Sequence, residues 1–331
     1  MDTPAHAHMI DTGINSELTV LSCDALSAPL HRLAENMPNA LQKIIERKFV
    51  EVQERKQHAP LELLQEKVRS MPRPRNFFRA VVRDSAEPVR VIAEIKKKSP
   101  SAGLIRNDFD PVDIAQRYHQ AGAAAISCLT DEFDFGGHLD FIELIRAAVP
   151  LPVLRKDFIV DPWQIWESRA AGADAILLIA ECLTEQDIVD FQILAVELGL
   201  TTLLEVHDVE SLYRVQNHVG FPHAGYSLLG INNRDLKTMK TDLAHTFRMV
   251  DLIEDRRVVV SESGIRTAQD IQRLQQHEVG IVLVGEHLLR QQELFQPRVV
   301  ASVGIVLVGE HLLRQSDPGQ ALRELRGANK I

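Results

Sequence analysis

Short apolar runs alternate along the chain with stretches whose apolar residues have helical spacing. Runs that are apolar throughout are typical of strands buried on both faces, and their alternation with helices indicates βαβ units around a parallel sheet. The runs predicted to be strands are VIAEIK (91–96), AAISCL (124–129), LPVLRK (151–156), DAILLI (174–179), TLLEV (202–206), SLLGIN (227–232), RVVVSE (257–262) and GIVLVG (280–285).

The spacing of these runs predicts a closed barrel. Their starts are about 23 to 33 residues apart, which is the size of a βα unit. Eight such units form a (β/α)8 TIM barrel of about 250 residues, and residues 91–331 fit that length. A doubly wound open sheet is the alternative, but no GxGxxG follows the first strand to favour it.

The residues before the first strand read as helices. NALQKIIERKFVEVQERK places Leu41, Ile44, Ile45, Phe49 and Val52 on one face, and PLELLQEKVRS and FFRAVV follow it. Before residue 37 no clear period exists. We therefore predict a loosely ordered arm over 1–36 and a single domain over 37–331 that includes N-terminal helices at 37–90.

One segment occurs twice without a change. VGIVLVGEHLLRQ spans 279–291 and again 303–315, so GIVLVG at 304–309 is a ninth strand-like run in a fold that needs eight. We expect one copy to form strand 8 and the other to lie outside the barrel wall. Because the first copy directly follows its helix, we favour it slightly, although identical segments have identical propensities.

Composition narrows the class of protein. The chain has 331 residues, a net charge of −9 and three widely spaced cysteines without CxxC spacing. This predicts neither a disulfide framework nor a zinc site, and the acidic balance argues against a nucleic-acid partner. With no membrane-length apolar run and no secretory signal pattern, we expect a cytoplasmic protein without a membrane partner.

Candidate chemistry lies at the strand ends, because barrel enzymes work at the C-terminal ends of their strands. Taken singly, most charged residues there are solvated. Glu94 and Glu205 differ because each lies inside an apolar run, where an unpaired carboxylate costs several kcal/mol. Lys96 and Lys156 are available at the same barrel end. The polar residues at the strand ends are Glu94, Lys96, Ser99, Thr130-Asp131-Glu132, Lys156-Asp157, Glu205, Asn232-Asn233-Arg234-Asp235, Ser261-Glu262-Ser263-Gly264 and Gly285.

The last two strands carry a possible phosphate site. In barrels, the loops after strands 7 and 8 often hold phosphate through backbone N–H groups. Gly264 follows strand 7, and Gly285 precedes the helical segment EHLLRQ. Either glycine alone also fits an ordinary turn.

Five motifs together resemble the indole-3-glycerol-phosphate synthase family, over roughly residues 39–331. The resemblance is closest to the bacterial synthase barrels that are sometimes fused to a phosphoribosylanthranilate isomerase, and we expect no such second barrel in this chain. The family also adds helices that cover its barrel, as predicted for 37–90. The matching motifs are AEIKKKSPSAG, LRKDFIVDPWQI, LLEVHD, GINNRDL and VSESGI.

The resemblance implies a carboxy-lyase of tryptophan biosynthesis without a metal or cofactor. Its substrate, 1-(2-carboxyphenylamino)-1-deoxyribulose 5-phosphate, closes a ring and loses CO₂ and water. By resemblance, Lys156 is the general acid that protonates the carbonyl and Glu205 is the base in later proton removal. Lys96 would pair with the substrate carboxylate or act as the acid in dehydration, and Glu94 and Asn232 would orient the lysines and the substrate.

The resemblance also implies substrate-binding residues. Arg234 would contribute to the carboxylate side and Ser263 to positioning. The phosphate would be held by Ser99, Gly264 and the glycine after strand 8, which is Gly285 or Gly309 depending on the copy. The expected partner is this small phosphorylated molecule, and the expected assembly is a monomer or weak homo-oligomer.

Two other functions compete with this one. Another sugar-phosphate barrel enzyme would share the phosphate site, but it would not require both lysines together with Glu94 and Glu205. An inactive barrel, disabled by the repeated strand-8 segment, is the non-enzymatic alternative.

Overall fold

A computed structural model describes residues 39–82, 90–100, 103–105, 108–236, 238–265, 267–284 and 304–308. The arm predicted over 1–36 and the helical segment EHLLRQ expected after Gly285 lie outside these ranges. The helices are α1 (Asn39–His58), α2 (Leu61–Ser70), α3 (Phe77–Val81), α4 (Pro111–Gln120), α5 (Glu132–Phe135), α6 (Asp140–Ala148), α7 (Pro162–Ala170), α8 (Glu185–Glu197), α9 (Val209–Val215), α10 (Ala244–Val250) and α11 (Ala268–Gln276), with 3-10 turns η4 (Ala180–Cys182), η5 (Gln216–His218), η6 (Ala224–Tyr226) and η7 (Arg256–Val258).

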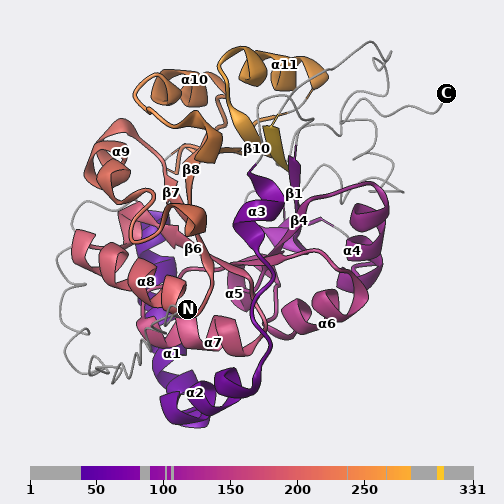
Figure 1. Cartoon of the computed structure of the whole chain (residues 1–331), viewed down its shortest axis with the longest axis vertical. Coiled ribbons are helices and arrows are strands. Elements are labelled where there is room, and N and C mark those ends of the chain that lie inside the picture. The colour runs from indigo at the N-terminus through magenta and orange to yellow at the C-terminus, as the bar shows by residue number, and fades with distance from the viewer. Residues whose placement is uncertain are drawn as a thin grey trace, which may run out of the picture.

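Parallel strands form a curled sheet at the centre of the molecule, with helices around it (Figure 1). The strands are β1 (Arg90–Ile95), β4 (Ala125–Leu129), β5 (Val153–Lys156), β6 (Ala175–Ile179), β7 (Thr201–Val206), β8 (Ser227–Asn232), β9 (Val259–Glu262), β10 (Gly280–Val284) and β11 (Gly304–Val308), besides a two-stranded hairpin of β2 (Lys98–Ser99) and β3 (Gly103–Leu104). Every residue of β4, β6 and β7 is buried, as expected for strands covered on both faces. The predicted TIM-barrel-like α/β fold is therefore confirmed.

The pairing order runs β10-β11-β1-β4-β5-β6-β7-β8-β9 within the described residues. The strands at the two ends of this order, β10 and β9, lie in contact, so the sheet curls round on itself. Seven strands thus follow the predicted order, and the two copies of GIVLV occupy the place of the eighth.

The expectation that one copy lies outside the sheet is wrong. β10 and β11 pair in parallel with identical residues opposite each other, from Gly280 against Gly304 to Val284 against Val308. The slight preference for the first copy as strand 8 is also wrong at the contact with β1. There, β11 pairs with β1 at four positions, whereas β10 pairs with it at one. The physical reason is that identical segments offer the same backbone groups and propensity, so an edge that accepts one copy accepts the other.

Helix starts follow signals in the sequence. Asp110 and Asp161 each precede a proline, and each side chain caps the helix that begins there, α4 or α7. Thr184 and Thr267 form capping boxes at α8 and α11. A side-chain cap satisfies backbone N–H groups that have no partner inside the helix, and proline fits the first turn.

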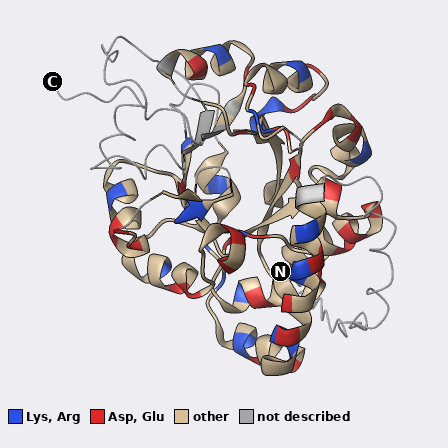
Figure 2. Ribbon diagram, turned by 180° about the vertical axis from the view of Figure 1, so that it is seen from behind, with Lys and Arg blue, Asp and Glu red and all other residues tan. Residues whose placement is uncertain are grey.

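The N-terminal helices pack on the barrel through α7. Val52 of α1 and Leu64 of α2 form an apolar cluster with Trp163 of α7, and Trp163 Nε1 donates to Ala59 O at 2.9 Å. No helix in the described ranges is both long and apolar enough to cross a bilayer. Figure 2 shows basic and acidic residues interspersed along the helices rather than gathered by sign.

Candidate active site

Lys156, the last residue of β5, lies between two carboxyl groups from other strands. Its Nζ is 2.6 Å from Glu262 Oε2 at the end of β9 and 3.3 Å from Glu205 Oε2 on β7. Burial alone would lower the pKa of Lys156, but the charges of Glu262, Glu205 and Glu94 raise it above its ordinary value. The lysine therefore carries its proton throughout the physiological range.

Glu94 and Lys96 at the end of β1 form a second pair, with 2.8 Å between Lys96 Nζ and Glu94 Oε1. Burial acts to raise the pKa of Glu94, but Lys96 and Lys156 together lower it. Because Glu94 interacts with Lys156 and Glu205 in this way, the β1 pair belongs to the same cluster. The structure thus brings together the two carboxylates and two lysines that the sequence placed at one barrel end.

Glu205 is held as a carboxylate. Asn232 Nδ2 donates to Glu205 Oε1 at 3.1 Å, and His207 Nε2 lies 3.2 Å from the same oxygen. Burial opposes ionisation, but Lys156 and His207 lower the pKa of Glu205 to about 2. The predicted neighbourhood of Glu205 and Asn232 is therefore present.

Glu262 is a member of the site that the sequence reasoning noted at a strand end but did not select. It is fully buried, and burial together with the charge of Glu205 raises its pKa well above the ordinary range despite the nearby Lys156. When one proton is shared between the two carboxyls, it therefore rests on Glu262. The signal was available, since Glu262 ends the apolar run RVVVSE as Glu94 and Glu205 interrupt theirs.

Gly230 on β8 makes room for Glu262. A Cβ built at residue 230 would come within 2.3 Å of Glu262 Oε1. A side chain at position 230 would therefore displace this carboxyl group, which explains why a glycine interrupts the apolar run SLLGIN.

The predicted substrate-binding residues differ in how they are connected to the cluster around Lys156. Arg234 is tied to the site by its backbone N–H, which donates to Asn232 Oδ1 at 3.0 Å, whereas its Nη1 donates to Met239 O at 3.3 Å within the following loop. Ser99 is buried and pairs with Gly103 in the β2–β3 hairpin. Gly285 and Gly309 lie outside the described residues.

Ser263 and Gly264 form a tight turn after β9. Both have left-handed backbone conformations, with φ of 66° and 80°. Asn233 Nδ2 stabilises the turn by donating to Ser261 Oγ and Ser263 O, each at 2.9 Å. A serine with positive φ is uncommon and persists where its surroundings fix it, so the turn that follows Glu262 has a fixed geometry.

A second buried cluster connects α1 to the same barrel end. Lys48 is fully buried, and its Nζ lies 2.9 Å from Asp131 after β4 and 3.0 Å from Asp157 after β5. Arg155 completes the network through Asp157 at 3.0 Å and Glu167 at 2.8 Å. Because Asp157 follows Lys156 directly, this network also holds the backbone of the central lysine.

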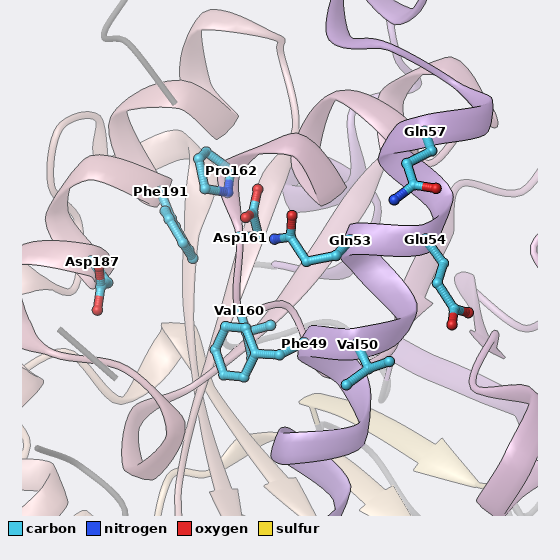
Figure 3. Close-up of a pocket in the computed structure, with 10 residues that line it drawn as sticks. All are labelled: Phe49, Val50, Gln53, Glu54, Gln57, Val160, Asp161, Pro162, Asp187 and Phe191. Carbon is cyan, nitrogen blue, oxygen red and sulfur yellow. The ribbon is translucent and has the colours of Figure 1, made fainter. Parts of the chain in front are cut away.

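A hollow of about 350 Å³ on the outside of the molecule is a competing location (Figure 3). It lies between α1 and the start of α7 and includes none of the predicted site residues. Asp161 pairs with Lys56 at 2.6 Å, and Asp187 belongs to the capping box of α8. Since these carboxylates already have structural partners, the hollow offers little chemistry. No group of His, Cys, Asp and Glu in the described part of the chain is arranged to hold a metal ion.

Comparisons with known proteins identify the family of the chain. The family model described as indole-3-glycerol phosphate synthase matches residues 41–298. The chain belongs to the indole-3-glycerol phosphate synthase family. Its function is that of the family, in tryptophan biosynthesis.

Two relatives support the assignment over most of their length. An indole-3-glycerol phosphate synthase of Rhodopirellula baltica is 49% identical over 226 residues, which are 68% of this chain and 84% of the relative. The enzyme of the same name from Rhodospirillum rubrum is 45% identical over 260 residues, 78% of this chain and 97% of the relative. The 3-hexulose-6-phosphate synthase of Salmonella typhimurium shares the fold alone, with a TM-score of 0.52 and 13% identity over 72% of this chain and 98% of that one.

Proposed function

We propose that the cluster around Lys156 carries out a carboxy-lyase reaction on 1-(2-carboxyphenylamino)-1-deoxyribulose 5-phosphate. Ring closure joins the aromatic carbon that bears the carboxylate to the ribulose carbonyl carbon, and the carbonyl oxygen takes up a proton. Loss of CO₂ and then of water restores aromaticity and gives indole-3-glycerol phosphate. This proposal rests on family membership together with the arrangement of charges at the strand ends.

Lys156 is proposed as the acid in ring closure. Negative charge develops on the carbonyl oxygen as the new C–C bond forms, and an ammonium group within hydrogen-bond reach stabilises it. Its position favours this role, because a lysine held between Glu205 and Glu262 at the barrel end is protonated at neutral pH and can place its ammonium group beside the developing oxyanion. This is the observation that best supports the proposal.

The later steps need groups that accept and donate protons on the same ring. We assign proton removal to Glu205, with Glu262 holding the proton that the two carboxyl groups share. Lys96 would pair with the substrate carboxylate or protonate the departing hydroxyl, and Glu94 fixes its position at 2.8 Å. Asn232 holds Glu205 in place.

Substrate binding is assigned to groups around this centre. Arg234 would serve the carboxylate side and Ser263 the positioning of the ring, while Ser99, Gly264 and the glycine after strand 8 would bind phosphate. A phosphate held away from the reacting atoms supplies binding energy that orients them. We further infer a cytoplasmic protein, monomeric or weakly self-associating, without nucleic-acid or membrane partners. Light scattering of the purified chain tests its assembly.

The direct test is turnover of the purified protein. Incubated with the anilino-deoxyribulose phosphate, it should form a product with indole fluorescence and release one CO₂ per turnover. A folded protein that binds the substrate but yields neither product would show that the repeated strand segment has produced an inactive barrel, and would refute the proposal.

A further inference from the structure

His207 lies next to Glu205, the proposed base, and has no role in the reaction proposed above. It follows β7 one residue after Val206, and only 7% of its side chain is exposed. Its Nε2 is 3.2 Å from Glu205 Oε1, which is an ion-pair distance, although the ring is not aligned for a directed hydrogen bond. On the other side of the ring, Nδ1 lies 3.1 Å from Glu181 Oε2 in η4.

Glu181 grips this histidine at two points. Its Oε1 accepts the backbone N–H of His207 at 2.8 Å, while Oε2 contacts the ring. A carboxylate bound in this way fixes both the position and the rotation of the imidazole, in the same manner as groups that orient a catalytic histidine. The pair joins η4 to the end of β7 through two residues that are 26 positions apart in sequence.

Contact with two carboxylates determines the charge of His207. A neutral imidazole has one N–H and one lone pair, so it would turn a lone pair toward one of the two carboxylates. Only the imidazolium suits both. Burial would lower the pKa of His207, but Glu181 and Glu205 raise it above its ordinary value.

The other charged and titratable groups around the ring do not change this conclusion. Lys156 on β5 opposes the positive charge, but its effect on the pKa of His207 is smaller than those of Glu181 and Glu205. His245 of α10 faces the backbone of His207, and burial and Arg248 lower the pKa of His245, so it adds little positive charge at neutral pH. The imidazolium therefore persists beside Glu205.

We propose that His207 is a positioning residue whose cation, anchored by Glu181, keeps the proton shared by Glu205 and Glu262 on Glu262. The inference rests on the base role proposed for Glu205. The positive charge of His207 lies beside Glu205 and stabilises its ionised form, whereas the cation described beside Glu262 is Lys156, which the two carboxyl groups share. Without the cation, the proton affinities of Glu205 and Glu262 become more similar, so Glu205 holds the shared proton for more of the time.

The test compares two substitutions by the ratio of variant to wild-type kcat/KM from pH 5.5 to 9. In Glu181→Gln, His207 loses one carboxylate and its pKa falls, so the ratio should decline as the pH rises through the new pKa and then level off at the ratio of His207→Gln. Below the new pKa, where the ring is charged again, the ratio should approach one. His207→Gln has no ring to titrate, so it should show no such alkaline decline and instead an acid limb displaced to higher pH as Glu205 protonates more readily.

Further measurements separate this role from a structural one. If Glu181 acts only through His207, the double variant should match His207→Gln, whereas multiplying losses would overturn the inference. Glu197→Gln, the same change on the exposed surface of α8, should leave the ratio at one across the range. Histidine NMR gives a readout independent of turnover, because the His207 resonance should titrate above pH 6.5 in the wild type and lower in Glu181→Gln.

The outcomes distinguish this inference from the proposed function. An inactive wild type would contradict the proposed function. An active wild type with a pH-independent Glu181→Gln ratio, or with His207 titrating at or below pH 6.5, would contradict the positioning role alone.

Discussion

Lys156→Met removes the positive charge at the centre of the site while keeping a side chain of similar length. Lys156 faces Glu262 at 2.6 Å and Glu205 at 3.3 Å. At an effective dielectric constant of about 20, the charges of Lys156 and Glu205 attract by about 5 kcal/mol at this separation, whereas Glu262, which holds the shared proton, contributes a hydrogen bond. Most of that attraction offsets the cost of removing the charges from water, so the measurable effect is smaller.

The loss of stability is bounded by proton uptake. Breaking a buried ion pair typically costs about 3–5 kcal/mol. A carboxyl with an ordinary pKa of about 4.3 can instead take up a proton at pH 7 for about 3.7 kcal/mol. We therefore expect the free energy of unfolding of Lys156→Met at pH 7 to be about 3–4 kcal/mol lower than that of the wild type. Because the folded variant binds an extra proton, the deficit should shrink by about 1.4 kcal/mol for each pH unit lowered toward pH 5.

The catalytic loss should exceed what instability explains. Removing a general acid costs about 10²–10⁴ in rate, which we expect in kcat measured by indole fluorescence at a temperature where the variant is folded. Lys156→Arg is the matched control. It restores a positive charge, and with it much of the stability, but its guanidinium does not give up a proton. Near-wild-type kcat in either variant would refute the acid role, and a stability deficit independent of pH would refute the proton-uptake argument.

Three further predictions follow from the same geometry. Glu205→Gln should lower kcat more than it raises KM, because a base acts in the transition state; an effect confined to KM in steady-state kinetics would make Glu205 a binding residue. Glu262→Gln should lower kcat. In urea unfolding from pH 5 to 9, its free energy of unfolding should rise relative to that of the wild type as the pH increases, because a carboxyl whose pKa is raised in the folded state stabilises the protein only at low pH. A difference in unfolding free energy that does not change with pH would contradict the raised pKa. Deletion of 279–302, which gives the same chain as deletion of 292–315, should leave an active protein that is at least as stable and more soluble, since one GIVLVG suffices for eight strands; an inactive or unfolded deletion variant in the same assays would show that both copies are required.

Local signals in the sequence predicted most of the fold. The Asp-Pro pairs at 110–111 and 161–162 begin helices because the cap and the proline act within one turn. Within the described residues, the apolar runs became parallel strands with ends displaced by at most two residues. Glu94, Lys96, Lys156, Glu205 and Asn232 meet because strand polarity alone carries the C-terminal ends of parallel strands to one side.

What the sequence did not predict depends on contacts between distant segments. Lys48 looked like one more polar position on an amphipathic helix, yet it is fully buried between Asp131 and Asp157, more than 80 residues away. His207 gains its charge from Glu181, in a turn with no motif of its own. Helical or strand periodicity indicates which face is buried but not which charged residue that face contacts. Such ion pairs can therefore be identified only in the folded barrel.

The repeated segment adds a strand without separating the catalytic residues. Strand 8 of a closed barrel must adjoin both strand 7 and strand 1, and here the two copies divide those contacts, β10 lying against β9 and β11 pairing with β1. Lys156, Glu205 and Asn232 lie on β5, β7 and β8. The pairings β5–β6, β6–β7 and β7–β8 set the register of these strands, and none of them involves either copy. Glu94 and Glu262 do lie on the strands that flank the insertion, yet both still act on Lys156. The position of the reacting groups is therefore fixed by the uninterrupted run from β1 to β9, and the extra strand bears mainly on the loops that leave the barrel beside it.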